Sequence, residues 1–392
     1  ALAQAPQEAP ARPRVVNELP KPWETYAARP LARAAAEPDA RQLPVALGHL
    51  RATGYTHFSV MSRGKDGRMN LFSYVGAQHQ SGKESAIDYR FSTDHGATWT
   101  TRRLLDGAGQ GVDWRIGASG VTARGRIILV LVRIDLPTQT NTIGSIHSDD
   151  NGATWSQYAE LKQDPPSPFG GKGSQVVTYG QIKTTPSGRL VMMAYVGPFN
   201  FSMTSDDNGA SWRRTTMVRS DVPYSEAAVQ PIDDDNWVSV FRIDRGRTQM
   251  AQFVTHDAGA TWEDLGPLNI PPSPGYVSPT LDLVRADGRA TLVLGVTDRT
   301  TGQSMLRTAD PAQATRSAQV WSGPRVFAQG LRVRSGYQTA APDPACDRLV
   351  IANHRETSAA TASLEVAMIK YSDLLPGHAP HPVSGAACPL PH

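Results

Sequence analysis

The sequence predicts an all-β protein, a six-bladed β-propeller with four-stranded antiparallel blades. Two observations lead to this prediction: a turn motif that recurs four times, and an aromatic residue that recurs at six places. Repeats of about 40–50 residues with short apolar runs between turn residues are typical of propellers. The 392 residues include 34 Gly and 30 Pro, and no 3.6-residue apolar period is found after about residue 43.

The recurring turn has the frame Ser/Thr-x-Asp-x-Gly-x-Thr/Ser-Trp, with copies at 92–99, 148–155, 205–212 and 255–262. The Asp accepts hydrogen bonds from nearby backbone N–H groups, the Gly takes a positive φ, and the Trp anchors the next strand by packing. The closing Trp residues are 56, 57 and 50 positions apart, which is enough chain for one blade.

An aromatic residue opens the expected innermost strand of every blade. The six openings are Tyr55, Trp114, Tyr179, Tyr224, Tyr276 and Tyr337. A turn and an apolar strand follow most of them, as at residues 185–195, 233–241 and 285–294, which indicates a hairpin between the first two strands of a blade. We expect the ring to close by pairing of residues 43–50 with the last blade near residues 364–371.

Composition excludes several classes of function. The 39 Lys and Arg and the 36 Asp and Glu leave a formal net charge of +3, so the sequence indicates no nucleic-acid-binding field. No apolar run reaches the roughly 18 residues that a membrane span needs. The sequence indicates no cofactor and no metal, and it leaves open a structural Ca²⁺ in a loop.

Both ends of the chain differ in character from the predicted propeller at 41–376. Residues 1–40 are rich in Ala, Pro, Arg and Glu and are expected to form a flexible extension, and residues 377–392 a C-terminal tail. Cys346 and Cys388 are either a disulfide that tethers this tail or two separate thiols. A disulfide, and a start that looks like the remainder of a processed leader, would fit a secreted or periplasmic protein.

The starts of the innermost strands line one axial face of a propeller, and this face is the expected site. The openings bring polar, titratable residues there: His57, Arg115, Gln181, Glu226 and Tyr337. An acid on the channel axis is costly unless it is paired, so Glu226 is the residue that most strongly indicates function.

The turn frame resembles the Asp-box of the sialidase superfamily, whose propellers include non-catalytic members. Glu226, in Tyr-Ser-Glu-Ala-Ala-Val, and Tyr337, in Ser-Gly-Tyr-Gln-Thr-Ala, resemble the catalytic segments of that family. The resemblance implies that Tyr337 is a nucleophile and that Glu226 takes the phenol proton during attack. A tyrosine nucleophile avoids bringing a carboxylate against an anionic sugar and is an exception to the two-carboxylate scheme.

The resemblance also implies arginines that clamp a substrate carboxylate, because a guanidinium binds a carboxylate bidentately. Arg242 and Arg299 match clamp positions, with Arg307 as the competing assignment for Arg299, and Glu356 matches a supporting acid. Arg115, in Trp-Arg-Ile-Gly-Ala-Ser, resembles a clamp motif that has moved to the second blade.

The first blade departs from the family pattern. The family opens this blade with Tyr/Phe-Arg-Ile-Pro, whereas this chain has Tyr-Thr-His-Phe at residues 55–58. The loop at 76–84 contains no Asp for the acid/base role. We expect His57, with His79 or Glu84, to transfer the leaving-group proton.

These residues fit three hypotheses. The first is an exported sialidase-like glycoside hydrolase acting on an acidic or unusual sugar in a glycan or polysaccharide. The second is a polysaccharide lyase on the same propeller, with His57 and Tyr337 as base and acid. The third is a non-catalytic propeller that binds glycan or protein, in which Tyr337 plugs the channel and the arginines form ion pairs between blades. The family-like positions of Glu226, Arg242 and Tyr337 favour the enzymes.

Overall fold

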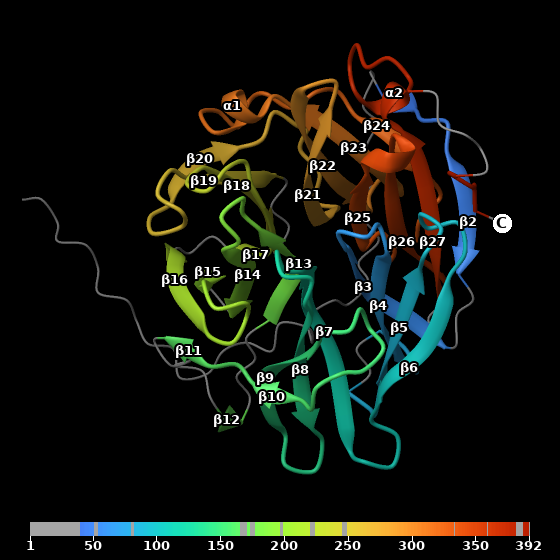
Figure 1. Cartoon of the computed structure of the whole chain (residues 1–392), viewed down its shortest axis with the longest axis vertical. Helices are drawn as coiled ribbons and strands as arrows, with labels where there is room; N and C mark the ends of the chain where they lie inside the picture. Colours follow the sequence, from blue (N-terminus) through green and yellow to red (C-terminus); the bar gives the residue numbers. More distant parts are fainter. Residues whose placement is uncertain are drawn as a thin grey trace, which may run out of the picture.

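The computed structural model describes residues 40–50, 54–79, 82–164, 171–172, 177–196, 199–219, 224–244, 249–332, 334–358, 360–381 and 387–391. Within these residues the regular secondary structure is almost entirely β-strand, arranged as curled sheets around a ring (Figure 1). The predicted all-β fold class is confirmed. No described helix is long and apolar enough to cross a membrane.

Hydrogen bonds join the described strands into four sheets, two of which continue from one blade to the next. We divide these sheets into six antiparallel sets of four strands, which we call blades 1 to 6. Blade 1 consists of β3 Tyr55–Arg63, β4 Met69–Gly76, β5 Ala86–Ser92 and β6 Thr100–Asp106. Blade 2 consists of β7 Val112–Val121, β8 Ile127–Asp135, β9 Thr140–Ser148 and β10 Ala159–Glu160. Blade 3 consists of β13 Val177–Thr184, β14 Leu190–Val196, β15 Phe199–Ser205 and β16 Trp212–Arg219. Short β11 Gln163–Asp164 pairs with β16, and β12 Gly171–Lys172 pairs with β9.

The second half of the ring has the same arrangement. Blade 4 consists of β17 Tyr224–Pro231, β18 Trp237–Ile243, β19 Met250–Thr255 and β20 Glu263–Pro267. Blade 5 consists of β21 Tyr276–Ala286, β22 Arg289–Asp298, β23 Gln303–Ala309 and β24 Arg325–Ala328. Blade 6 consists of β25 Gln338–Asp343, β26 Arg348–Ser358, β27 Thr361–Lys370 and β2 Ala46–Leu50. The two sheets that continue between blades do so through short parallel pairings of β7 with β13 and of β27 with β3. The described residues also include two short α-helices, α1 Pro311–Ala314 and α2 Tyr371–Leu374, and a 3-10 turn at Pro344–Cys346.

Of the predicted aromatic openings, Tyr55, Tyr224 and Tyr276 begin their innermost strands and Tyr337 directly precedes β25. Trp114 and Tyr179 lie two residues inside β7 and β13, because these two strands begin earlier than the sequence predicts.

The ring closes as the sequence predicts. Strand β2 pairs antiparallel with β27, with Ala46 opposite Met368 and Leu50 opposite Leu364. The sequence did not predict β1 Arg41–Gln42, which adds a parallel edge to β24. The innermost strands β3, β7, β13, β17, β21 and β25 contact one another in turn around the axis. Their aromatic ends therefore meet at one axial face.

The four turn motifs have one geometry. In the second copy the Oγ of Ser148 accepts from the N–H of Gly152 at 2.8 Å, and Asp150 accepts from the N–H of Thr154 at 2.8 Å. Gly152 has φ +85° and Asn151 has φ +59°, the left-handed pair that the turn requires. All four Asp residues bind within their own turns, at the ends of third strands and away from the axis.

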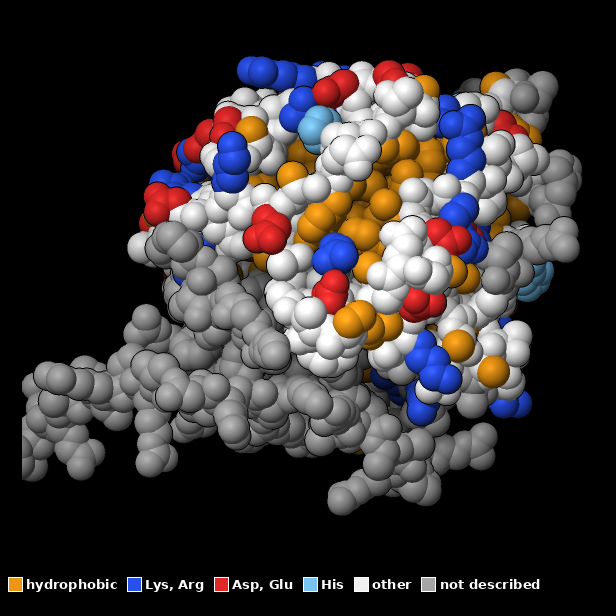
Figure 2. Space-filling view, turned by 90° about the horizontal axis from the view of Figure 1, so that it is seen from below, with side chains coloured by type: hydrophobic (Ala, Val, Ile, Leu, Met, Phe, Trp, Pro, Cys, Tyr) orange, Lys and Arg blue, Asp and Glu red, His pale blue; other side chains and the backbone are white. Residues whose placement is uncertain are grey.

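Apolar side chains fill the spaces between neighbouring blades. Between blades 1 and 2, for example, Val60, Phe72 and Ile87 pack in one cluster with Trp114 and Leu129. On the face shown in Figure 2, hydrophobic side chains gather in a patch near the centre, and basic and acidic side chains are scattered together around it. This mixture agrees with the nearly balanced charge of the sequence.

The structure joins Cys346 and Cys388 in a disulfide. Cys346 lies in the turn that follows β25, and Cys388 lies near the end of the chain. A second contact holds the same segment, because Arg348 donates from Nη1 to the carbonyl of Pro389 at 2.9 Å. Of the two alternatives for the cysteines, the tether is the one observed. The predicted N-terminal extension lies almost wholly outside the described residues.

Candidate active site

A phenol and a carboxylate from two blades that flank blade 5 meet at the axial face. Tyr337 precedes β25 of blade 6, and Glu226 lies in β17 of blade 4. The Oη of Tyr337 donates to Oε1 of Glu226 at 2.5 Å. The other oxygen, Oε2, accepts from Nη1 of Arg242 at 2.9 Å and from the N–H of Ser278 at 3.2 Å. Three blades thus hold one carboxylate.

The surroundings of Glu226 favour its ionised form. Burial opposes ionisation, but the charge of Arg242 and the hydrogen bonds from Tyr337 and Arg242 lower the pKa of Glu226 below its usual value. Arg242 is shared, because its Nε lies 2.9 Å from Oδ1 of Asp244. The ionised carboxylate faces the phenol oxygen of Tyr337 and can accept its proton.

An irregularity in the innermost strands places these side chains. Pairing with the second strand shifts register just after the opening in β3, β7, β13, β17 and β21. At these bulges Phe58, Gly180 and Ser278 have φ of +45°, +73° and +56°. A bulge redirects a side chain and leaves a backbone group unpaired. The N–H of Ser278, freed in this way, is the one that binds Glu226.

Two further phenols surround the pair. Tyr179 and the hydroxyl of Ser278 share a hydrogen bond of 2.6 Å, and Ser278 Oγ also accepts from the N–H of Gln338 at 3.2 Å. Burial, followed by the negative charge of Glu226, raises the pKa of both Tyr179 and Tyr195. Both phenols therefore stay protonated and polar without adding charge to the site.

Three histidines lie on the other side of Tyr337. The ring of His57 lies 4.3 Å from that of His79, 4.2 Å from that of His354 and 4.8 Å from that of Tyr337, between centroids. Burial, followed by the neighbouring histidines, lowers the pKa of His57 well below 6.5. Burial and then Arg299 lower the pKa of His79 to about 3. The cluster is neutral near pH 7.

The exposure of these histidines separates their possible roles. His57 is fully buried, and neither ring nitrogen has a hydrogen-bond partner among the described residues. The ring of His57 is thus shielded from solvent, and its transfer of a proton to the leaving group stays a prediction. His79 is partly exposed and remains accessible. His354 was not predicted as a site residue, and the register of β26 places it beside Tyr337.

The three predicted clamp arginines have different partners. Arg115 binds Asp113 through Nε at 2.8 Å and Nη2 at 2.5 Å, and Arg242 binds Glu226 and Asp244. Arg299 donates only to backbone carbonyls in its described contacts, those of Ser335 at 3.0 Å and Arg334 at 3.2 Å. Its guanidinium lies 5.2 Å from the ring centroid of Tyr337, so its charge faces the site. The competing residue, Arg307, is buried within blade 5 and donates to the carbonyl of Ser322.

The remaining predicted residues have local partners. Glu356 accepts from Oη of Tyr55 at 3.1 Å, at the edge of the histidine cluster. The amide nitrogen of Gln181 donates to the carbonyls of Met61 and Ala340, which ties blade 3 to blades 1 and 6 across the channel. Glu84 is exposed and accepts from the N–H groups of Gly109 and Gly111. The structure therefore does not join Glu84 to the pair formed by Tyr337 and Glu226.

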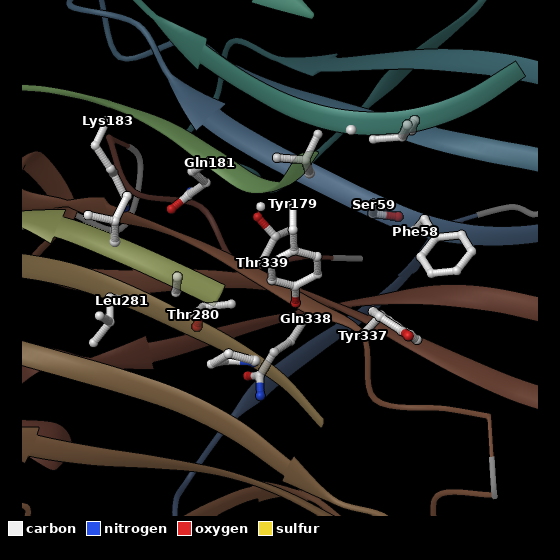
Figure 3. Close-up of a pocket in the computed structure, with 17 residues that line it drawn as sticks. Phe58, Ser59, Tyr179, Gln181, Lys183, Thr280, Leu281, Tyr337, Gln338 and Thr339 are labelled. Carbon is white, nitrogen blue, oxygen red and sulfur yellow. The ribbon is translucent and has the colours of Figure 1, made fainter. Parts of the chain in front are cut away.

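A cavity extends from Tyr337 along the axis of the ring. Figure 3 shows Tyr337 and Phe58 at one side of it and Lys183 and Leu281 at the other. Lys183 is paired with Asp282 at 2.7 Å. The charge of Lys183 is thus paired at one end of the cavity, whereas Tyr337, with the carboxylate of Glu226, lies at the other end.

Comparisons with known proteins agree with the fold. Residues 117–339 match the family model described as a BNR repeat-like domain. Curated sialidases of Paraclostridium sordellii and Clostridium perfringens are 28% identical over 233 residues and 29% identical over 212 residues. These matches cover 52% and 45% of this chain and 56% and 52% of the relatives, so the chain spans about half the length of the curated relatives it matches.

A solved structure of the NanB sialidase from Streptococcus pneumoniae matches with a TM-score of 0.66 at 13% identity, over 83% of this chain and 71% of that one. At this identity the likeness shows the fold alone. The family model, by contrast, matches more than half of the sequence. The chain belongs to the BNR repeat-like domain family of the sialidase superfamily.

Proposed function

We propose that the protein is a glycoside hydrolase that releases an acidic or unusual sugar from a glycan or polysaccharide. The observation that carries this proposal is the 2.5 Å hydrogen bond from Tyr337 Oη to the ionised Glu226. A phenol needs a nearby base to become a nucleophile at neutral pH, and Glu226 is held for that purpose by Arg242 and Ser278.

The proposed reaction has two steps. Tyr337 Oη bonds to the anomeric carbon while the glycosidic C–O bond breaks and the phenol proton passes to Glu226. A proton from the site or solvent completes the leaving alcohol. A water oxygen then bonds to the same carbon, its proton returns to the donor of the first step, and the bond to Tyr337 breaks. The phenolate recovers its proton from Glu226.

Charge near Tyr337 supports an anionic substrate. Arg299 faces the phenol ring, and the positive charges of Arg299, Arg334 and Arg115 all lower the pKa of His79. Arg115 and Arg242 already bind carboxylates, so Arg299 is the predicted clamp residue whose described contacts leave its charge uncompensated. We assign Arg299, with Arg334 beside it, to the substrate anion. This assignment differs from a symmetric three-arginine clamp.

The direct test is turnover of an aryl sialoside and of a panel of acidic polysaccharides by the purified protein. We expect product from the wild type, a loss of at least 100-fold in Tyr337→Phe and Glu226→Gln, and normal rates in Tyr158→Phe. Tyr158 is a matched control because its phenol binds Thr142 at the outer side of blade 2. Equal turnover by wild type and both site variants would rule out the assigned pair, and binding without any turnover would favour a non-catalytic propeller.

A specific observation also favours β-elimination as a second candidate. The neutral histidine cluster beside Tyr337 contains His79, a partly exposed imidazole that can accept a proton. In a lyase, His79 would remove the proton next to a uronate carboxylate, Arg299 would neutralise that carboxylate, and Tyr337 would protonate the leaving oxygen. The product carries a new C=C bond with ultraviolet absorbance, so one spectrum distinguishes elimination from hydrolysis.

We also propose that the protein is secreted or periplasmic. The disulfide between Cys346 and Cys388 supports an oxidising compartment, because such bonds persist in secreted and periplasmic proteins and are rare in the cytosol. Fractionation of the native host with detection of the protein in each compartment tests this point. Recovery only from the cytosol, with both thiols reduced, would contradict it.

A further inference from the structure

We propose that Asp287, His378 and His381 bind a Zn²⁺ ion that holds the C-terminal segment against blade 5. Asp287 lies in the turn between β21 and β22, at the opposite end of β21 from Tyr276 and hence away from the axial face of the candidate active site. The two histidines follow α2 in the spacing His-x-x-His. One nitrogen of each ring and one carboxylate oxygen lie within 4.8 Å of one another.

The contacts place three ligands, two imidazoles and one carboxylate, around one point. Oδ2 of Asp287 lies 2.6 Å from Nδ1 of His378, and Oδ1 of Asp287 lies 2.9 Å from Nε2 of His381. The side chain of His378 is only 3% exposed, whereas those of Asp287 and His381 are 36% and 59% exposed. An ion can therefore enter from solvent and reach an imidazole that is already fixed in place.

A fourth residue supports the proposed ligands from behind. Oδ1 of Asp347 lies 2.7 Å from Nε2 of His378, the ring nitrogen that does not face Asp287. Metal-bound histidines usually donate their second ring N–H to a carboxylate, which fixes the tautomer and makes the ligating nitrogen more basic. Asp347 also accepts from the N–H of His381 at 3.3 Å. It is a positioning residue for both histidines.

The donor set selects the metal. Two imidazoles and one carboxylate suit Zn²⁺, whereas Ca²⁺ and Mg²⁺ prefer oxygen ligands alone. Three protein ligands leave one tetrahedral position for water. The carboxylates of Asp287 and Asp347 together balance the charge of the divalent ion, with both imidazoles neutral. The other described cluster of this kind, His95, Asp343 and Cys346, lacks a free thiol because Cys346 is in the disulfide.

The proposed ion would be a second cross-link between the C-terminal segment and the propeller. The disulfide fixes Cys388 to the turn after β25, and the metal would fix residues 378–381 to the β21–β22 turn of blade 5. The two cross-links would connect the C-terminal segment to blades 6 and 5, which are neighbours in the ring. Because an ion that binds only the folded chain stabilises it by mass action, Zn²⁺ should raise the melting temperature.

Isothermal titration of the metal-stripped, untagged chain with zinc chloride tests the proposal. We expect one Zn²⁺ per chain, at least 10-fold weaker binding in Asp287→Asn and His381→Ala, and 10- to 100-fold weaker binding in Asp347→Asn. His256→Ala is the matched control, since His256 is an exposed histidine that binds Asn236 on blade 4. Absence of saturable binding, or equal affinity in Asp287→Asn and the control, would overturn the assignment.

A second measurement tests the site without any variant, so a variant that fails to fold does not affect its result. Replacing zinc by Co²⁺ gives visible absorption bands whose intensity reports tetrahedral coordination, and the wild type alone suffices for this reading. We expect a tetrahedral Co²⁺ spectrum that zinc abolishes, and a rise in the melting temperature of the wild type with zinc. An octahedral spectrum together with an unchanged melting temperature would exclude the proposed site.

Discussion

The phenol oxygen of Tyr337 lies 2.5 Å from a carboxylate oxygen of Glu226, although 111 positions separate the two residues in the chain. Glu226 lies in the innermost strand of blade 4 and Tyr337 directly precedes that of blade 6, so the packing of both blades against blade 5 brings them together. The backbone N–H of Ser278, from the blade between them, binds the same carboxylate. The candidate site is therefore a property of the assembled propeller and of no single repeat.

Removing the base should separate activity from folding. Glu226→Gln keeps the size of the side chain and its bonds to Ser278 and Arg242 but cannot accept the phenol proton, so we expect kcat to fall by about 10²–10⁴-fold. Arg242 keeps Asp244 as a partner, so the free energy of unfolding should fall by no more than about 3 kcal/mol. Kinetics and urea denaturation of the same preparations measure both effects. A large loss of stability with unchanged kcat would make Glu226 purely structural.

The sequence predicted the fold because each turn motif carries its own hydrogen bonds. Asp150 and Ser148 bind backbone groups no more than four residues away, so the motif forms in the same way in each blade. The pair of Glu226 and Tyr337 could also be predicted, since both stand at strand openings whose phase the motifs set. Local patterns of this kind survive in a single sequence.

What the sequence did not predict depends on register and on pairing. His354 lies in a second strand, where nothing in its neighbours distinguishes it from a core histidine, and the 2.9 Å bond from its N–H to the carbonyl of Tyr337 places it. Ser278 contributes a backbone N–H that a bulge releases. The partners of Arg115 and Arg242 could not be predicted either, because an arginine that clamps a substrate and one that binds an aspartate have the same sequence signature.

Arg299 should matter for substrate binding in a way that Arg307 does not. Its guanidinium is held by the carbonyls of Ser335 and Arg334 and faces Tyr337. For an anionic substrate, Arg299→Ala should raise KM by about 10- to 100-fold, since a charge-assisted hydrogen bond contributes about 1.5–3 kcal/mol. Arg299→Lys should recover part of this loss. An equal rise in KM for the neutral analogue of the substrate would show that the charge of Arg299 is not used.

The histidine cluster should make stability depend on acid. The pKa values of His57 and His79 in the folded chain lie below the unfolded value of 6.5, that of His79 at about 3, so the unfolded chain binds protons more readily. The stabilising contribution is complete above about pH 6.5 and is lost as the pH falls toward 3. The free energy of unfolding falls between pH 6.5 and pH 4, and we expect this fall to be smaller in His79→Gln than in the wild type by on the order of 2 kcal/mol.

Urea denaturation at a series of pH values measures this dependence, and His256→Gln serves as the control because His256 is exposed. The slope of His256→Gln should equal that of the wild type. A His79→Gln slope that also equals the wild-type slope would mean that the cluster titrates alike in the folded and unfolded chains.

The leaving group should control the rate if the protein is a hydrolase. The partly exposed His79 is neutral near pH 7, with a pKa of about 3, and the exposed Glu84 is bound to the backbone of Gly109 and Gly111. Neither is a strong proton donor to a departing alcohol, so substrates whose leaving groups need no protonation gain an advantage. We expect kcat/KM for a nitrophenyl glycoside to exceed that for the matching alkyl glycoside by about 10²-fold or more, the size of a missing general acid. Adding a carboxylate by Gln78→Asp or His79→Asp, in the loop after β4, should narrow this difference. A small dependence on the leaving group in the wild type would instead reveal an acid that the described contacts do not identify.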